Sequence, residues 1–126
     1  MKSNSTSLRI LVVDDEPLIR LILSMILKKK AEVNTVATAE EALDEIEAQY
    51  YDLCFLDIIL PGMTGLDAMK IINELSPKTK VTIMSASSID EAMQEQIDDF
   101  AYAFIEKPFG LSDIREVAER VAVAQN

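Results

Sequence analysis

Short apolar runs alternate with amphipathic stretches along the whole chain. Five short runs have the length and apolar character of strands, and the most apolar of them, 53–56, is typical of a strand buried on both faces in a parallel sheet. They predict strands over 8–13, 33–37, 52–57, 81–84 and 102–106. Each run is followed by a segment with apolar residues at helical spacing. This alternation predicts an α/β fold, with helices on both faces of a doubly wound, central five-stranded parallel sheet.

Helices are expected in the segments that follow these runs. Pro17 suits the first position of a helix, where its missing N–H leaves no bond unmade. Thr38 and Ser88 are each followed three residues later by a glutamate, which is capping-box spacing, and Thr64 precedes an aspartate by the same distance. The predicted helices cover about 17–30, 38–49, 64–75, 88–100 and 111–124.

The helix expected over 17–30 is apolar on more than one side. Beside the face that holds Ile19 and its helical neighbours, Leu18, Leu21 and Met25 form a second apolar stripe. This stripe either packs on a neighbouring helix or forms a docking surface, and the sequence favours neither interpretation.

The length of the chain fits one domain with a real core. We expect a single domain over residues 1–126, with its core at about 8–124 and a polar, flexible N-terminus at 1–7. No apolar run approaches the roughly 18 residues that span a membrane, and no signal-peptide pattern is present. We therefore expect a cytoplasmic protein without membrane contact. Cys54, the single cysteine, lies inside an apolar run and is expected in the core.

Histidine is absent, and the formal net charge is −10. Without histidine, this chain cannot use Ser-His-Asp or Cys-His catalysis, bind a metal through histidine, or carry a phosphohistidine. The negative charge argues against nucleic-acid binding, which needs a basic surface. The lysines at 28–30 are expected at the end of a helix, where they complement its dipole. An acidic chain suits hard cations and basic partner surfaces.

Polar side chains gather where the predicted strands end. The acidic residues 14–16 follow the first strand, Asp57 ends the third, Ser85 follows the fourth and Lys107 follows the fifth. Ligands of open α/β sheets bind at the carboxyl ends of the strands, so these side chains should share one edge. Acids brought together repel one another unless a cation neutralises them. The cluster therefore predicts Mg²⁺ binding and phosphoryl chemistry.

Each position also has a purely structural interpretation. Asp14-Asp15 can start a solvated loop, Ser85 can lead into a helix, and Lys107 can be an ordinary surface lysine. Taken one at a time, these are the commoner roles of such residues. A functional site is favoured because all four strand ends carry such groups: residues 14–16, Asp57, Ser85 and Lys107.

Together these motifs resemble the receiver domain of two-component response regulators. The matching positions are Asp14-Asp15, Asp57, Leu60-Pro61-Gly62-Met63, Ser85-Ala86 and Lys107-Pro108-Phe109. They occur in the order and at the separations typical of the family, and the resemblance covers about residues 8–124. It implies a single receiver domain with a (βα)5, flavodoxin-like fold, which agrees with the alternation of strands and helices.

The resemblance implies a phosphorylation switch. Asp57 would be the phosphoacceptor and would attack a phosphohistidine on a histidine kinase or a histidine phosphotransfer protein. Asp15 and Asp57 would bind Mg²⁺ directly, together with the backbone carbonyl of Ile59. Asp14 would act on the metal largely through water. Catalysis would then consist of positioning and charge neutralisation, as phosphoryl transfer generally requires.

Further roles follow from the resemblance, and so do three departures from it. Lys107 would pair with the phosphoryl group, Ser85 would hydrogen-bond to it in the active state, and the peptide bond after Lys107 is typically cis. Phe104 stands where many receivers have tyrosine, so a switch residue there could pack inward but has no hydroxyl group. Thr64 replaces a common aspartate, although both cap helices. The segment 98–103 lacks the usual glycine, which leaves the conformation of that loop open.

The surface that would signal lies around Ser85, Phe104 and the last two helices. The helix expected after Ser88 carries an acidic face that is either partner-facing or simply solvated: Asp90, Glu91, Glu95, Asp98 and Asp99. The reader of the signal stays open among an output domain, an effector protein and a second copy of the chain in a homodimer. We expect no direct nucleic-acid contact by this domain.

Two other classes of protein share parts of this pattern. A phosphohydrolase of the haloacid type would also form an aspartyl phosphate. Its family, however, needs a second acid two residues after the nucleophile, where this chain has Ile59. A flavodoxin-like nucleotide or flavin binder would need a glycine-rich loop after the first strand, whereas residues 14–16 are acidic and would repel phosphate.

Overall fold

The computed structural model describes residues 8–86 and 88–125, so the N-terminus expected to be flexible, 1–7, lies outside the described residues. The strands are β1 (Leu8–Val13), β2 (Ala31–Val36), β3 (Leu53–Asp57), β4 (Lys80–Ser85) and β5 (Ala103–Glu106). The helices are α1 (Pro17–Leu27), α2 (Ala39–Ala48), α3 (Gly65–Leu75), α4 (Glu91–Phe100) and α5 (Leu111–Gln125). Strand and helix alternate as the sequence predicted.

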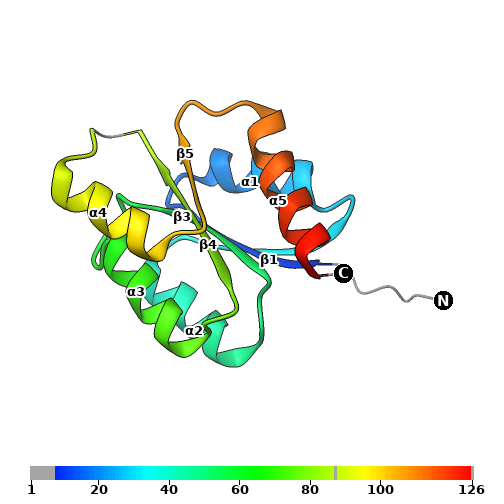
Figure 1. Cartoon of the computed structure of the whole chain (residues 1–126). Coiled ribbons are helices and arrows are strands. Elements are labelled where there is room, and N and C mark those ends of the chain that lie inside the picture. Colours follow the sequence, from blue (N-terminus) through cyan, green and yellow to red (C-terminus); the bar gives the residue numbers. More distant parts are fainter. Residues whose placement is uncertain (1–7, 87, 126) are drawn as a thin grey trace.

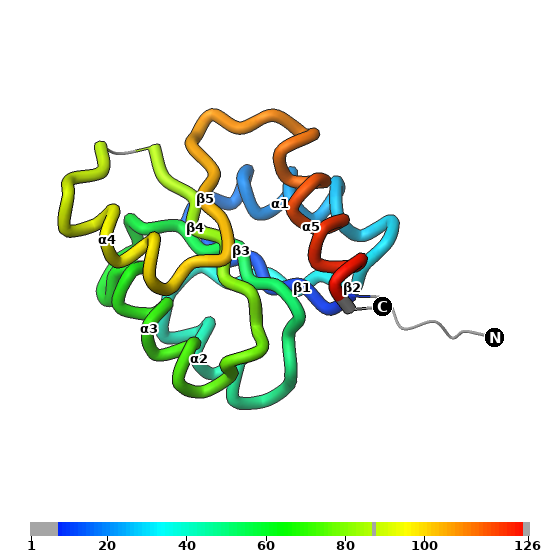
Figure 2. The backbone as a smooth tube through the Cα atoms, viewed as in Figure 1, coloured from blue at the N-terminus to red at the C-terminus, as the bar shows by residue number. Residues whose placement is uncertain are grey.

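The strands form one parallel sheet in the order β2-β1-β3-β4-β5. Figure 1 shows α1 and α5 on one face of the sheet and α2, α3 and α4 on the other. Figure 2 shows the same two layers of helices along the backbone trace. The doubly wound α/β fold is therefore confirmed. The chain leaves β1 for β2 on one side and crosses to β3 on the other, which places the switch point between β1 and β3.

The central strand β3 is buried along its whole length. Leu53 and Phe55 pack into the core beneath α1 and α5, whereas Cys54 and Leu56 pack into the core beneath α2 and α3. Both faces of the strand are covered, so its sequence is continuously apolar instead of alternating. Cys54 is a core residue as predicted, and burial raises the pKa of its thiol to about 12.

Helix caps explain where most of the helices begin. The Oγ1 of Thr38 accepts a hydrogen bond from the backbone N–H of Glu41 at 3.1 Å, which confirms this cap. Thr64 caps α3 in the same way, from the N–H of Asp67 at 3.2 Å. The prediction that Ser88 caps the fourth helix was wrong. Asp90 is the cap, since its carboxylate accepts from the N–H of Met93 at 2.8 Å.

Two element boundaries differ from the expectation because strand pairing decides them. We predicted a first helix to about residue 30 and a second strand from 33, but α1 ends at Leu27 and β2 begins at Ala31. Ala31 is the register partner of Leu8, so β2 starts level with β1. Lys28 caps the end of α1, and the chain turns directly into the strand.

The second apolar stripe of α1 faces solvent. Leu18, Leu21 and Met25 are 65%, 56% and 61% exposed. The interpretation that they pack on a neighbouring helix is therefore wrong for this chain.

Within the described residues, no helix has both the length and the apolar character needed to cross a bilayer.

Thr82 offers a test of the packing beneath α1 and α5. Its side chain is fully buried in β4, and among the described residues its Oγ1 is the one buried side-chain polar atom without a hydrogen-bond partner. A buried hydroxyl without a partner costs about 1–3 kcal/mol. Thr82→Val should therefore raise the free energy of unfolding, by about 1 kcal/mol, in urea denaturation.

Thr79 supplies the matched control. Its Oγ1 is also buried, but it donates to the backbone carbonyl of Tyr51 at 2.6 Å. Thr79→Val removes that bond and should lower the free energy of unfolding by about 1 kcal/mol. A loss of stability of equal size in both variants would contradict the assignment for Thr82.

Candidate functional site

Four strand ends converge at one edge of the sheet. Asp57 and Ser85 are the last residues of β3 and β4, and Asp14 and Lys107 directly follow β1 and β5. Because these strands are parallel and adjacent in the order β1-β3-β4-β5, their carboxyl ends meet. The side chains that the sequence placed at strand ends are therefore brought together.

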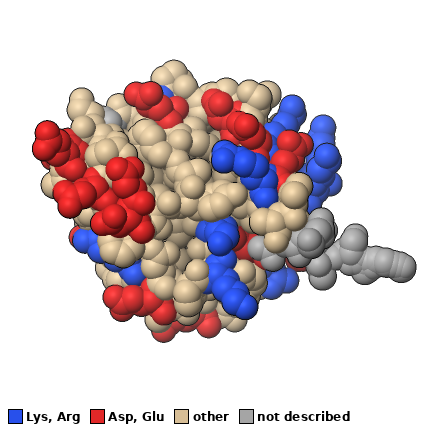
Figure 3. Space-filling view, in the orientation of Figure 1, with Lys and Arg blue, Asp and Glu red and all other residues tan. Residues whose placement is uncertain are grey.

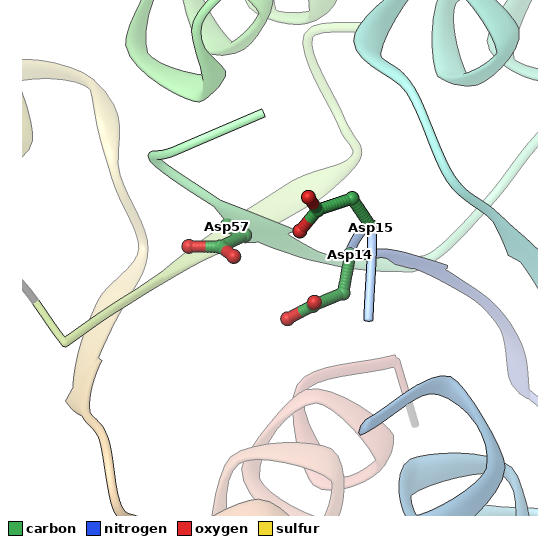
Figure 4. A group of neighbouring side chains, drawn as sticks. All are labelled: Asp14, Asp15 and Asp57. Atoms are coloured by element: carbon green, nitrogen blue, oxygen red, sulfur yellow. The ribbon is translucent and has the colours of Figure 1, made fainter. Parts of the chain in front are cut away.

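Three carboxylates form the centre of this edge. Asp14, Asp15 and Asp57 each offer an oxygen atom, and these atoms all lie within 4.8 Å of one another. Figure 4 shows the three side chains gathered between the ends of β1 and β3. Asp14 and Asp57 are buried, whereas Asp15 is exposed. The cluster thus joins a protected interior to solvent.

Lys107 holds the two buried carboxylates together. Its Nζ lies 2.7 Å from Oδ2 of Asp14 and 3.1 Å from Oδ2 of Asp57, and its side chain is 10% exposed. The Oε1 of Glu16 lies further away, at 3.6 Å. The ammonium group of Lys107, the residue after β5, therefore connects the side chains at the ends of β1 and β3. The peptide bond between Lys107 and Pro108 is cis, as the resemblance implied.

Asp14 is fixed by its own loop and by α1. Its Oδ1 accepts from the N–H of Glu16 at 2.9 Å, and its backbone carbonyl accepts from the Nη1 of Arg20 at 2.8 Å. Asp57 is held less tightly, since its Oδ1 accepts a 3.4 Å bond from the N–H of Ile59. The guanidinium of Arg20 was not anticipated from the sequence. Its position on the first helix turn was the only available signal.

The protonation equilibria reflect burial and charge pairing. Burial raises the pKa of Asp57, the charge of Asp14 raises it further, and the ammonium of Lys107 opposes both effects. Burial acts to lower the pKa of Lys107, but the hydrogen bonds that its ammonium donates to Asp14 and Asp57 outweigh burial, so this pKa is raised. Lys107 is therefore firmly charged. Three aspartates against one lysine leave a net formal charge of −2, which attracts a divalent cation.

Ser85 and Phe104 lie on the neighbouring strands. Ser85 is fully buried, and its backbone carbonyl accepts from the N–H of Lys107 at 2.8 Å, which ties the end of β4 to the residue after β5. Phe104 pairs in register with Ile83 of β4, and its side chain is 36% exposed. Its side chain is not part of the carboxylate cluster, and it lies at the surface on β5.

Gly65 permits the close approach of α3 to the site, and it was missed in the sequence. A Cβ atom at this position would lie 2.0 Å from the backbone oxygen of Asp57 and 2.9 Å from the Cα of Ile58. The N–H of Gly65 also donates to the carbonyl of Ile58 at 2.8 Å. The helix therefore begins directly against the backbone of Asp57. A glycine at the first position of a predicted helix was the available signal.

Comparison with known proteins gives a consistent result. A family model described as the response regulator receiver domain matches residues 10–119. The chain is 34% identical to the chemotaxis protein CheY of Thermotoga maritima over 90% of this chain and 97% of CheY. It is 35% identical to the response regulator protein PilR of Pseudomonas aeruginosa over 85% of this chain, but it spans only 24% of PilR.

A solved structure supports the same relationship. The response regulator protein TrrA of Thermotoga maritima, in complex with Mg²⁺-BeF, superposes with a TM-score of 0.80 at 32% identity. The match covers 90% of this chain and 97% of that one.

The approach of α3 to Asp57 gives a test. Gly65→Ala must displace the backbone of either segment, and overpacking of this kind costs about 1–3 kcal/mol. We expect a loss of that size in the free energy of unfolding, measured by urea denaturation.

Gly110 is the matched control for Gly65. A Cβ atom there would meet nothing closer than 3.5 Å, at the carboxylate of Asp113. Gly110→Ala should therefore change stability by no more than about 0.5 kcal/mol. Similar losses in the two alanine variants would show that the close contact is not what matters.

Proposed function

The chain belongs to the response regulator receiver domain family, whose members accept a phosphoryl group, and we propose that Asp57 is the residue that accepts it. The observation that carries this assignment is the contact of Asp57 with Lys107 inside the carboxylate cluster. Asp14 has no exposed surface, and both of its carboxylate oxygens make shorter hydrogen bonds. Asp15 is exposed and forms no ion pair with Lys107. Among the three aspartates of the cluster, Asp57 alone combines an ammonium partner with loosely held oxygens.

The proposed reaction is a direct phosphoryl transfer. A carboxylate oxygen of Asp57 attacks the phosphorus of a phosphohistidine, the P–N bond breaks, and the electron pair leaves with the imidazole nitrogen. The product is an aspartyl phosphate on this chain and a histidine on the donor. The ammonium of Lys107, 3.1 Å from Asp57, stabilises the negative charge of the phosphoryl oxygens. The same chain promotes the later hydrolysis, so it acts as a signalling switch and not as a conventional enzyme.

Mg²⁺ is the proposed cofactor of this transfer. Asp15 and Asp57 would bind the ion with the backbone carbonyl of Ile59, and Asp14 would act largely through water. The donors fit the ion, because they are all hard oxygen atoms and the carboxylate oxygens lie within 4.8 Å of one another. When bound, the ion neutralises charge on the phosphoryl oxygens. Binding of Mg²⁺-BeF by the relative TrrA supports this assignment.

Ser85 and Phe104 are the proposed switch residues. Ser85 ends β4 and directly follows Met84, the register partner of Asp57, so its hydroxyl is the proposed donor to a phosphoryl group on Asp57. Phe104 lies on β5, which pairs with β4, and its side chain is exposed in this structure. A contact of Ser85 made only in the phosphorylated state shifts the equilibrium towards a conformation in which Phe104 packs inward. The surface of α4, β5 and α5 changes as a result.

The exposed stripe of α1 is the proposed docking surface for the phosphoryl donor. α1 begins at Pro17, directly after the acidic loop, and Leu18, Leu21 and Met25 form an exposed stripe that runs along the helix from its first turn. An apolar stripe of this kind fits a helix of a histidine kinase or a histidine phosphotransfer protein. Arg20 of the same helix donates a hydrogen bond to the backbone carbonyl of Asp14. The proposed docking surface and the carboxylate cluster are therefore connected through α1.

The remaining assignments stay proposals. We take residues 1–126 as a single receiver domain, with its core at about 8–124, that signals to an output domain, an effector protein or a second copy of the chain. An output domain is relevant because relatives such as PilR are about four times as long as this match. A cytoplasmic location and the lack of nucleic-acid contact stay predictions from the sequence.

The phosphoacceptor can be tested by intact mass. With acetyl phosphate and Mg²⁺, the wild-type protein should gain a single phosphoryl group, and Asp57→Asn should gain none because it lacks the attacking oxygen. Asp44→Asn, on the exposed side of α2, is the control and should label like the wild type. Equal labelling of Asp57→Asn would overturn the assignment.

The metal ligands can be tested by calorimetric titration with Mg²⁺. Asp15→Asn should weaken binding at least roughly tenfold, because a charged ligand is lost. Glu16→Gln removes the same charge from the adjacent residue, whose side chain is 63% exposed, and should have a much smaller effect. An equal loss in both variants would mean that Asp15 acts only through its charge.

The docking stripe can be tested with a phosphorylated histidine kinase that transfers to the wild-type protein. Leu21→Gln should slow this transfer by roughly tenfold, as for a buried apolar contact in an interface. Labelling by acetyl phosphate, which needs no docking, should not change. Leu75→Gln, on an exposed position of α3, should leave both rates as in the wild type. Slower labelling by acetyl phosphate in Leu21→Gln would place the defect in the site instead.

A further inference from the structure

Arg20 makes two hydrogen bonds to the acidic loop that follows β1. Its Nη1 donates to the backbone carbonyl of Asp14 at 2.8 Å, and its backbone N–H donates to the carbonyl of Glu16 at 3.2 Å. Asp15 lies between these two acceptors in the sequence. One residue of α1 therefore holds the loop on both sides of Asp15, and the bond from the side chain is the part of this contact that requires arginine.

The remaining polar atoms of Asp14 are bonded as well. Its N–H donates to the carbonyl of Val36 at 3.2 Å, its Oδ1 accepts from the N–H of Glu16 and its Oδ2 accepts from Lys107. With the bond from Arg20, every polar atom of this buried residue has a partner. Removal of the guanidinium leaves a buried carbonyl without its partner, which is unfavourable unless the backbone of the loop moves.

The stability of α1 does not explain an arginine at this position. Arg20 is the fourth residue of the helix, and the helix dipole disfavours a cation near the N-terminus. The side chain of Arg20 is half-buried and turns back to the acidic loop, where it finds the carbonyl of Asp14. The contact with the loop therefore accounts for the cation, and the helix alone does not.

The direction of the Asp15 carboxylate depends on the backbone of this loop. Figure 4 shows the side chain of Asp15 turned towards Asp57, and its oxygen lies within 4.8 Å of oxygens of Asp14 and Asp57. Because Asp15 is exposed, core packing does not fix its side chain, and the backbone must direct it. Groups that hold a metal ligand without touching the ion typically contribute strongly to metal affinity.

We propose that Arg20 is a positioning residue of the metal site. Its guanidinium fixes the backbone of the acidic loop through the carbonyl of Asp14, and the fixed loop presents Asp15 to Mg²⁺ together with Asp57. Arg20 itself does not touch the ion. The inference rests on the proposed function, because Mg²⁺ is the proposed cofactor of that function.

The charge of Arg20 and its hydrogen bond act on the metal in opposite directions. Loss of a cation beside the acidic cluster makes the site more negative, which by itself strengthens the attraction for a divalent cation. Loss of the hydrogen bond loosens the loop, which weakens binding. The sign of the change in Mg²⁺ affinity therefore separates positioning from charge. A purely structural role would lower the free energy of unfolding but leave the Mg²⁺ affinity of the folded protein unchanged.

The test is a calorimetric titration of the whole chain with Mg²⁺ alone. Arg20→Met keeps a long unbranched side chain but removes the guanidinium, and we expect it to weaken Mg²⁺ binding by at least roughly fivefold. Arg120→Met is the matched control, because it removes the same charge from an exposed residue of α5, over which Figure 3 shows cationic side chains at the surface. This control should change the affinity by less than about twofold, since salt screens an exposed charge.

A second measurement needs neither the metal nor a variant. In the metal-free wild-type protein, the guanidinium N–H groups of Arg20 should exchange with water more slowly than those of Arg120, as measured by NMR, because Arg20 is bonded to Asp14. In Arg20→Met, the amide of Glu16, which is bonded to Oδ1 of Asp14, should exchange faster than in the wild type. Arg120→Met should leave that amide unchanged.

Several results would overturn the inference. These are unchanged or tighter Mg²⁺ binding by Arg20→Met, an equal loss of affinity in both methionine variants, and equal exchange of the two guanidinium groups in the wild type. The exchange measurement decides the question even if Arg20→Met does not fold. The proposed cofactor fails separately, because a wild-type protein that binds no Mg²⁺ rejects it whatever Arg20 does.

Discussion

The bridge from Lys107 to Asp14 and Asp57 is the interaction on which the site depends. Two buried carboxylates side by side repel each other strongly, and one ammonium at 2.7 and 3.1 Å makes their proximity tolerable. The lysine follows β5 and reaches residues at the ends of β1 and β3, so one side chain connects strand ends across four of the five strands of the sheet. A phosphoryl group on Asp57 would enter this balance directly and compete for the same ammonium.

The backbone around Asp57 is also held in place by contacts with neighbouring segments. The parallel sheet aligns the strand ends, and Gly65 lets α3 begin within van der Waals contact of the Asp57 carbonyl. The N–H of Ile58 donates to Met84 and its carbonyl accepts from Gly65, so the chain is held on both sides just after the acid. Asp57 therefore has a rigid backbone and a comparatively loosely bonded carboxylate, which suits a group that must react.

Sequence patterns identified the strands, the carboxylates and Lys107, because apolar runs end where parallel strands end. They could not show which carboxylates Lys107 contacts, since that depends on β1 lying next to β3 in the sheet. Ser88 and Asp90 are equally good caps by type, so residue type alone could not show that α4 begins after Asp90. The close approach at Gly65 and the bond from Arg20 depend on backbone positions that spacing alone does not contain. The exposure of the α1 stripe likewise required the helix to be placed on the sheet.

α1 combines two kinds of position within a single helix. Arg20 is bonded to the backbone of the acidic loop, and Leu23 and Leu27 are buried in the core, so these positions are constrained by the fold. Leu18, Leu21 and Met25 are more than half exposed, and substitutions at such positions usually cost little stability. If the stripe is the docking surface proposed above, duplicated copies of the gene could acquire different partners through substitutions there while the carboxylate site stays the same. Insulation between parallel signalling pathways could arise in this way from a few surface substitutions.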